Sequence, residues 1–286
     1  MIIHYIDKEI FIMKKLLAIV LTLMLAVALF AGCGTEKANN VSEEKDTLVC
    51  GVTIFEKMNE QEADGTWTGF ETEFAQEVGK IIGMDVDFQV IDWAQKYNEL
   101  NSGAIDCVWN GFTANSSDEV NGAKVKRSDL VDFSYGYMLN QQCIVTKAEN
   151  ASKITSEADL KGKTACVEGG SAGASYASTV TDADKIFSTT AQINAFSEVK
   201  SGAVDFAVVD IILAKNICGQ GDYTDLAIAE AIELDSEIYA VGFKKGSELT
   251  SKVNEAIKTL SENGKLMEIA KKYGFENTIQ VTENID

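Results

Sequence analysis

An internal repeat constrains the fold of this chain more than any other feature of its sequence. Residues 97–111 read YNELNSGAIDCVWNG, and residues 196–210 read FSEVKSGAVDFAVVD. Both copies run from an aromatic residue and a Glu through Ser-Gly-Ala to an Asp within an apolar stretch. This pattern predicts a helix that ends at the glycine, followed by a buried strand. Because the unit occurs twice, we expect two similar lobes.

Alternating strands and helices are predicted around both copies. The elements expected before the first copy are a strand over 48–52, a helix with Phe70, Phe74, Val78 and Ile81 on its apolar face, and a strand over 86–90. Those expected around and after the second copy are a strand over 164–167, a helix opened by Gly169-Gly170-Ser171, a strand over 239–243 and two helices over 249–273. Strands that alternate with helices indicate a parallel α/β sheet in each lobe.

The start of the chain predicts export. Lys14 and Lys15 precede an apolar run over 16–30, which is short for a membrane span and suits the apolar region of a signal peptide. We therefore expect a signal peptide over 1–32, with Met13 as an alternative start of translation.

A lipid anchor is predicted directly after this run. Ala31-Gly32-Cys33 resembles a bacterial lipobox, in which Cys33 becomes the lipidated first residue of the mature protein. Residues 33–46 are polar and predict a flexible tether. The alternative is an uncleaved anchor helix.

Composition excludes several classes of function. The formal net charge is −19, which argues against nucleic acid as a partner because phosphate binding needs clustered Lys and Arg. The single histidine is His4, in the predicted leader, so the folded part lacks imidazole for catalytic triads or metal ligation. The cysteines beyond Cys33 have no CxxC spacing and suit small buried side chains. We therefore expect no catalytic residue, no metal and no cofactor.

The strand ends indicate where a ligand would bind. Ligands of open α/β sheets bind beyond the carboxyl ends of the strands. Asp210 closes an apolar strand, where an acid is costly without a partner. If the lobes face each other, one cleft is lined by the residues at these ends, which are Phe55, Asn110, Gly111, Thr113, Gly170, Ser171 and Asp210.

Arg127 suggests the chemistry of the ligand. It is the single arginine in a chain with 25 Lys and Arg residues. A guanidinium binds a carboxylate through two parallel hydrogen bonds, and Asp210 would bind an ammonium. Opposite charges on the two lobes predict a free amino acid that bridges them as they close. The alternative is that Arg127 is a surface cation beside Lys124 and Lys126.

Over roughly residues 47–275 the chain resembles the family 3 solute-binding proteins, which are the polar amino-acid receptors of ABC importers. The resemblance is carried by the segments GTWTGFETEFAQEVG (65–79), SGAIDCVWNGFT (102–113), RSDLVDFSYGYM (127–138), VEGGSAG (167–173) and SGAVDFAVVD (201–210). It implies a two-lobed, periplasmic-binding-protein-like α/β fold, in which each lobe is a mixed, mostly parallel sheet flanked by helices. The chain would cross the hinge twice, with lobe 1 over 47–139 and 237–286 and lobe 2 over 140–236.

The resemblance also implies the ligand contacts. Phe55 and Trp93 would enclose the aliphatic part of the ligand, Asn110, Gly111 and Thr113 would bind its ammonium and carboxylate, Arg127 would bind the carboxylate, Ser171 and Ala172 would add donors from a helix N-terminus, and Asp210 would bind the ammonium. Two departures stand out. The segment Ala114–Lys126 is longer than in the family, which would displace Arg127, and Gly173 stands where some relatives have a side chain that contacts the ligand.

We therefore predict a monomeric extracytoplasmic lipoprotein, held on the outer face of the bacterial cell membrane by a lipid such as palmitate on Cys33. It would deliver an amino acid to a membrane-embedded ABC permease with its ATPase. The first strand end has no acid before Glu56, so we expect a neutral ligand such as glutamine, cystine or another small polar amino acid. The alternatives on the same fold are a dehydratase-type enzyme, with Glu56 or Glu168 as its acid, and a sensory receptor.

Overall fold

The computed structural model describes residues 46–285, which belong to one compact unit. The predicted signal peptide, Cys33 and nearly all of the predicted tether lie outside these residues. Within the described range, no helix has the length and apolar character needed to cross a membrane.

The first sheet combines strands from both ends of the described chain. Its order is β4 (Asp85–Val90), β1 (Thr47–Val52), β5 (Cys107–Val108), β15 (Gly242–Phe243) and β8 (Asp132–Phe133). Strand β1 runs parallel to β4 and β5, whereas β15 runs antiparallel to β5 and β8. The C-terminal part of the chain therefore returns to the first sheet, as the sequence predicts.

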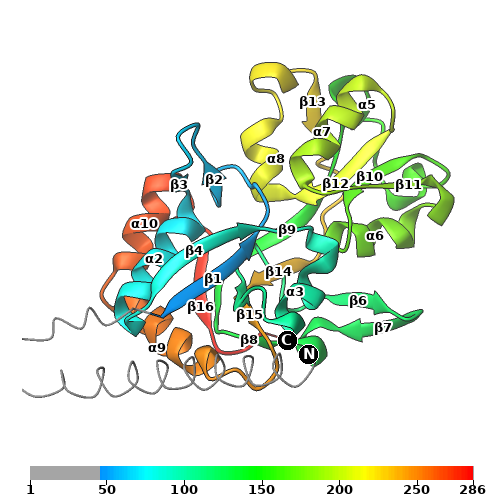
Figure 1. Cartoon of the computed structure of the whole chain (residues 1–286). Helices are drawn as coiled ribbons and strands as arrows, with labels where there is room; N and C mark the ends of the chain where they lie inside the picture. Colours follow the sequence, from blue (N-terminus) through cyan, green and yellow to red (C-terminus); the bar gives the residue numbers. More distant parts are fainter. Residues whose placement is uncertain (1–45, 286) are drawn as a thin grey trace, which may run out of the picture. The chain divides into compact units, whose positions relative to one another are not determined.

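Three helices pack beside this sheet (Figure 1). Helix α2 (Phe70–Ile82) contacts β4, and α9 (Leu249–Glu262) and α10 (Lys265–Tyr273) contact α2. The predicted apolar face of α2 is correct for Phe70, Phe74 and Val78, which are fully buried. It is wrong for Ile81, which is 44% exposed, because Ile82 takes the core-facing position in the last turn.

The second sheet has the order β11 (Ile186–Thr189), β10 (Ala165–Glu168), β12 (Phe206–Asp210), β9 (Gly136–Lys147) and β13 (Leu226–Ile228). Strand β10 is parallel to β11 and β12, and β9 is antiparallel to β12 and β13. Helices α6 (Ala172–Val180), α7 (Gln192–Ser201) and α8 (Ile211–Ile217) contact these strands.

Strand β9 links the two sheets. Its later residues pair with β12, whereas its earlier residues pair with β14 (Ser236–Tyr239) and β16 (Ile279–Thr282) (Figure 1). Strand β14 leads on to β15 in the first sheet, so the chain passes between the sheets along two adjacent antiparallel strands. The predicted lobe boundaries at 139/140 and 236/237 fall within this pair of strands.

Both copies of the repeat form the predicted unit. Helix α3 (Lys96–Ser102) ends at Gly103, and α7 ends at Gly202. Each glycine is left-handed, with φ of 77° and 79°, a conformation that glycine adopts without steric cost. The strands that follow are β5 and β12, so equivalent units deliver one strand to each sheet.

The segment between Thr113 and Arg127 folds into a hairpin of β6 (Ser117–Val120) and β7 (Ala123–Lys126). Asn121 and Gly122 form its turn with positive φ angles, the conformation that Asn-Gly favours in tight hairpins. The remaining elements are β2 (Glu60–Gln61), β3 (Trp67–Thr68), α4 (Arg127–Leu130), α5 (Ala148–Ala151) and the short 3-10 helices η1 (Trp93–Gln95), η2 (Glu157–Leu160), η3 (Ala183–Lys185) and η4 (Gly221–Tyr223).

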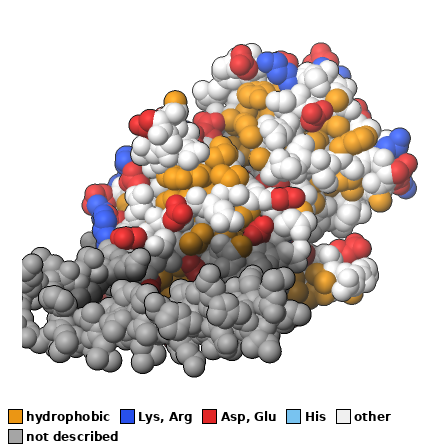
Figure 2. Space-filling model, viewed as in Figure 1, with side chains coloured by type: hydrophobic (Ala, Val, Ile, Leu, Met, Phe, Trp, Pro, Cys, Tyr) orange, Lys and Arg blue, Asp and Glu red, His pale blue; other side chains and the backbone are white. Residues whose placement is uncertain are grey.

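The surface carries mixed charge. On the face shown in Figure 2, Lys and Arg side chains stand at separate places and do not gather into one basic patch. This distribution agrees with the excess of acidic residues and differs from the clustered basic surface that nucleic-acid binding requires.

Candidate ligand-binding site between the two sheets

One small cavity collects eight of the nine residues that the sequence predicts as ligand contacts. Its volume is about 10 Å³, near the lower limit for a cavity that holds one water molecule. The predicted residues that line it are Trp93, Asn110, Gly111, Thr113, Arg127, Ser171, Ala172 and Asp210. Gln142, Glu168 and Gln192 complete the lining. Neither glutamine is a predicted ligand contact, and Glu168 is predicted only as the acid of the alternative enzyme.

Phe55 is the predicted residue outside this lining. It is buried, and its ring lies 3.3 Å from the point where a Cβ on Gly111 would stand. Such a Cβ would also come within 3.1 Å of the Tyr239 ring, and Gly111 has φ +58°. A side chain at position 111 would therefore be strained as well as crowded, which explains the glycine.

Parallel strand pairing brings the acids of the second sheet together. Ala165 and Cys166 of β10 pair with Phe206 and Ala207 of β12, so both strands end at the same edge of the sheet. Glu168 ends β10 and Asp210 ends β12. Two buried carboxyl groups thus reach the cavity from neighbouring strands.

Asp210 is bound by three side-chain amides. Its Oδ1 accepts hydrogen bonds from Asn140 and Gln142, each at 2.6 Å, and its Oδ2 accepts one from Gln192. No Lys or Arg of the described residues forms an ion pair with it. Burial raises the pKa of the Asp210 carboxyl group. An anion that is held by neutral donors and lacks a cationic partner suits a ligand ammonium.

Glu168 has fewer partners than Asp210. Its side chain is buried, and within residues 46–285 its Oε1 accepts no hydrogen bond. Burial, followed by the nearby Asp210 carboxylate, raises the pKa of Glu168 to about 8, although Lys96 and Thr53 act in the opposite direction.

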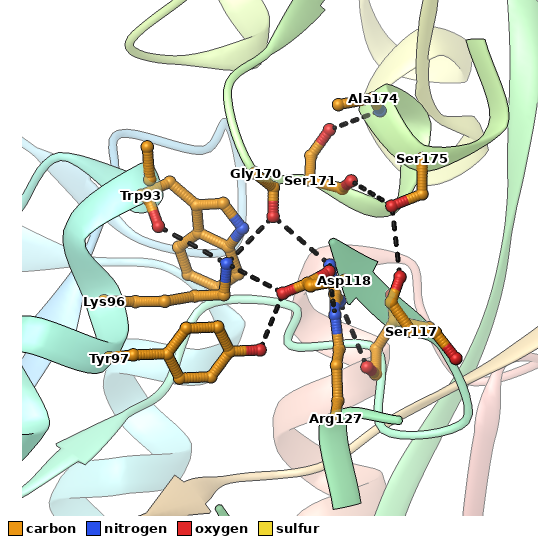
Figure 3. Close-up of polar contacts among 12 residues, drawn as sticks. Trp93, Lys96, Tyr97, Ser117, Asp118, Arg127, Gly170, Ser171, Ala174 and Ser175 are labelled. Atoms are coloured by element: carbon orange, nitrogen blue, oxygen red, sulfur yellow. Dashed lines mark hydrogen bonds and ion pairs between the residues drawn. The ribbon is translucent and has the colours of Figure 1, made fainter. Parts of the chain in front are cut away.

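Arg127 is paired with a carboxylate from the hairpin. Asp118 of β6 accepts a hydrogen bond from Arg127 Nε at 2.9 Å, and its Oδ1 also lies 2.9 Å from Nη2 (Figure 3). Tyr97 donates its hydroxyl hydrogen to Asp118 Oδ2 at 2.6 Å, and Lys96 Nζ lies 3.3 Å from the same oxygen. Arg127 is 1% exposed, so the alternative of a surface cation is wrong.

The charged side chains of this cluster shift one another's pKa values. Although burial opposes it, the charges of Arg127 and Lys96 hold the pKa of Asp118 below its usual value. Burial and the adjacent Arg127 lower the pKa of Lys96 to about 8, with Asp118 acting against this shift. Asp118 is therefore the group that keeps two buried cations charged side by side.

The same cations connect the two sheets. The carbonyl oxygen of Gly170, just before α6, accepts hydrogen bonds from Lys96 Nζ at 2.9 Å and Arg127 Nη2 at 3.3 Å. Close by, Ser175 of α6 donates to the carbonyl of Ser117 at 3.1 Å (Figure 3). The adjoining cavity, lined by Arg127 and Ser171, is only about 10 Å³, so a ligand larger than an ammonium group requires the sheets to separate.

The Asn110 side chain and the Gly111 N–H form hydrogen bonds within the first lobe. The Asn110 side chain accepts from the backbone and hydroxyl of Thr53 and donates to the Thr53 carbonyl and to Asn59. The Gly111 N–H donates to the Glu71 carboxylate at 2.9 Å. Burial raises the pKa of Glu71 to about 7, although Gly111 and Tyr137 donate hydrogen bonds to it. Neither the Asn110 side chain nor the Gly111 N–H is available to a ligand in this arrangement.

A second cavity of about 680 Å³ adjoins the first and shares Thr113, Gln142 and Ala172 with it. Its acids include Glu237, whose Oε2 accepts from Asn140 and Gln142, the same amides that bind Asp210. We place the candidate site at the smaller cavity because the opposite charges and the predicted residues meet there.

Comparison with known proteins agrees with this geometry. Residues 48–277 match the family of bacterial extracellular solute-binding proteins, family 3, and the chain belongs to this family. It is 30% identical over 278 residues to the L-cystine-binding protein TcyA of Bacillus subtilis strain 168, covering 91% of this chain and 97% of that one. It is 29% identical over 269 residues to the arginine-binding extracellular protein ArtP of the same strain, covering 91% and 98%.

The fold is also that of solved relatives. The structure of an ABC uptake transporter substrate-binding protein from Streptococcus pneumoniae with bound histidine superposes with a TM-score of 0.69 at 29% identity, covering 83% of this chain and 95% of that one. The two-lobed α/β fold implied by the sequence is therefore confirmed.

The buried acids predict how stability changes with pH. Burial raises the pKa of Glu71 and Glu237 from 4.5 to about 7 and that of Glu168 to about 8. The folded state therefore binds these protons more tightly than the unfolded state, and stability falls as pH rises toward 8. We expect the Tm of the ligand-free protein to decline between pH 6 and 8, where ordinary carboxyl groups are already ionised. A Tm that rises over this window would contradict the prediction.

Asp118→Asn should destabilise the protein by about 3–5 kcal/mol, because it leaves two buried cations without their counter-ion. Denaturant unfolding measures this change. Glu119→Gln is the matched control, since Glu119 is exposed on the same strand and should change stability by less than about 0.5 kcal/mol. Equal effects of the two substitutions would show that the ion cluster contributes little.

Proposed function

We propose that this protein is the extracytoplasmic receptor of an ABC-type amino-acid importer and binds a free amino acid between its two lobes. The observation that supports this most directly is the pair of opposite charges around one cavity. Arg127 lines the cavity from the first lobe and Asp210 lines it from the second, while Lys96 lies beside Arg127 on the Gly170 carbonyl. An amino acid carries the complementary carboxylate and ammonium, so it would join the lobes through its own charges.

The ligand carboxylate would replace the Gly170 carbonyl. Lobe separation removes this carbonyl and leaves donors on Lys96 and Arg127 without an acceptor. A carboxylate forms stronger hydrogen bonds with these cations than a neutral carbonyl does. Asp118 would remain on the other edge of the guanidinium and keep it oriented. Ser171 and Ala172, at the N-terminus of α6, would supply further donors.

The rest of the ligand would meet a mixed surface. Asp210 would bind the α-ammonium, and Phe55, Trp93 and Thr113 would flank the carbon skeleton. Asn110 and Gly111 would contribute through their carbonyl oxygens, because the Asn110 side chain and the Gly111 N–H have internal partners.

The importer role and the lipid anchor belong to this proposal. Cys33 would be lipidated and residues 33–46 would tether the folded part, as a monomer, to the outer face of the cell membrane. A membrane-embedded permease with its ATPase would receive the ligand. The family is one of bacterial extracellular proteins, which supports the location.

The class of side chain needs a separate argument. The preference for a neutral ligand rested on the absence of an acid at the end of the first strand. Glu168 reaches the cavity from the other sheet, which that argument did not consider. The names of the relatives include both arginine and L-cystine, so they do not decide between charged and neutral side chains.

A panel of twenty amino acids is first screened for the one that raises the Tm most; a ligand at 1,000 times its Kd adds about 4 kcal/mol of stability. Calorimetry with that amino acid then tests the role of Asp210. Asp210→Asn should weaken binding of that ligand by about 2–5 kcal/mol, because the ammonium loses a buried anion. The amine that lacks the α-carboxylate should bind the parent protein weakly. Recovery of the bound amino acid unchanged separates a receptor from a dehydratase. A panel in which no amino acid stabilises the protein would refute the proposed function.

The anchor can be tested in cells. Cys33→Ser should abolish incorporation of labelled fatty acid and release the protein into the medium or a soluble fraction, because no thiol remains to be acylated. Ala31→Gly at the neighbouring position retains the thiol and a small residue, and it should keep the label. A Cys33→Ser protein that stays in the membrane would favour the uncleaved anchor helix instead.

A further inference from the structure

Glu168 is a buried carboxyl group that lacks a protein partner for one oxygen. It is 3% exposed, it lines the small cavity, and its Oε1 accepts no hydrogen bond within the described residues. The other buried acids nearby differ in this respect. Asp210 accepts from three amides, and Glu71 accepts from Gly111 and Tyr137.

The cations near Glu168 are already engaged. Lys96 is the cation that most favours its ionised form, but Lys96 Nζ lies on Asp118 and on the Gly170 carbonyl. Arg127 is held by Asp118 as well. The remaining charges that face Glu168 are the carboxylates of Asp210 and Asp92. Among the described residues, Glu168 therefore forms no ion pair with a Lys or Arg.

Two acids line the cavity, and neither forms an ion pair with a Lys or Arg of the described residues. Asp210 is held by neutral amides, and Glu168 has no donor at Oε1. The single ammonium of a zwitterion pairs with Asp210 alone, so Glu168 keeps its proton, in line with its raised pKa in the ligand-free cleft. A ligand with a second cation lets Glu168 ionise and form an ion pair.

We propose that Glu168 binds the side chain of the ligand, and that the ligand is an L-amino acid with a cationic side chain. This inference rests on the proposed function, because it assumes that Asp210 binds the α-ammonium. Glu168 then forms a hydrogen-bonded ion pair with the distal ammonium or guanidinium. A cationic ligand replaces the neutral one expected from the sequence, because the acid that binds the side chain comes from the second sheet and not from the end of the first strand.

The experiment compares ligands that differ in one charge. L-Arginine and L-citrulline share their shape, but the ureido group of citrulline is neutral. We expect calorimetry on the full-length protein in detergent to show that arginine binds at least about tenfold tighter than citrulline. The same order should hold for L-lysine over L-norleucine. This comparison uses the parent protein and does not depend on any variant.

Glu168→Gln assigns the effect to this residue. It should reduce the arginine-to-citrulline affinity ratio by about tenfold or more, with citrulline affinity changed by less than about threefold. The ligand-free variant should also melt about 2–4 °C higher, because a buried unpaired acid is gone. Glu56→Gln is the control, since Glu56 is the acid nearest the end of the first strand, and it should leave the ratio unchanged.

Each contrary result has a distinct meaning. Citrulline or norleucine binding as tightly as its cationic partner would overturn the inference and leave amino-acid binding intact. An equal loss for both ligands in Glu168→Gln would place Glu168 on the α-ammonium and not on the side chain. A loss of the ratio in Glu56→Gln alone would assign the side chain to the first strand. No binding of any amino acid would refute the proposed function together with this inference.

Discussion

The contact between the two lobes at the site depends on the Asp118 carboxylate. Lys96 and Arg127 are both buried, and burial together with the charge of Arg127 disfavours the charged form of Lys96. Asp118 accepts hydrogen bonds from Arg127 and Tyr97 and pairs with Lys96, so the two cations share one anion. Each cation also donates to the Gly170 carbonyl across the cleft, while Arg127 Nη1 donates to the Thr113 carbonyl of its own lobe. Without the anion, desolvation and repulsion would oppose this arrangement.

This arrangement determines what a ligand carboxylate would compete with. Asp118 binds the guanidinium through Nε and Nη2, whereas the lobe-to-lobe contact uses a neutral carbonyl. Displacing a neutral acceptor costs less than displacing a buried anion, and a carboxylate is the stronger acceptor for a cation. The β6–β7 hairpin, through Asp118, therefore holds Arg127 at the cavity. The neutral carbonyls of Thr113 and Gly170 bind the other edge of the guanidinium, and the Gly170 carbonyl is the partner from the opposite lobe.

The sequence predicts the parts of the site that topology determines. Asn110, Gly111 and Asp210 lie at strand ends, and parallel strands place such residues at one edge whatever the side-chain details. The sequence does not predict pairings that depend on register and rotamer. Asp118 lies in a hairpin without a counterpart in the repeat, and the inward hydrogen bonds of the Asn110 side chain depend on Thr53 and Asn59. Ile81 was misplaced because helical period alone does not locate the end of a packed face.

Apart from Asp118, four buried acids near the site differ in the partners that they still lack. Glu71 binds a backbone N–H and a hydroxyl, Asp210 binds three amides, and Glu237 binds two of the same amides and lines the larger cavity. These donors are neutral, so they stabilise a carboxylate without cancelling its charge. Glu168 has an oxygen without a donor among the described residues, and it borders the cavity that Asp210 also borders. Because a buried polar group without a partner is costly, the group that completes Glu168 is best sought outside the chain, in the ligand.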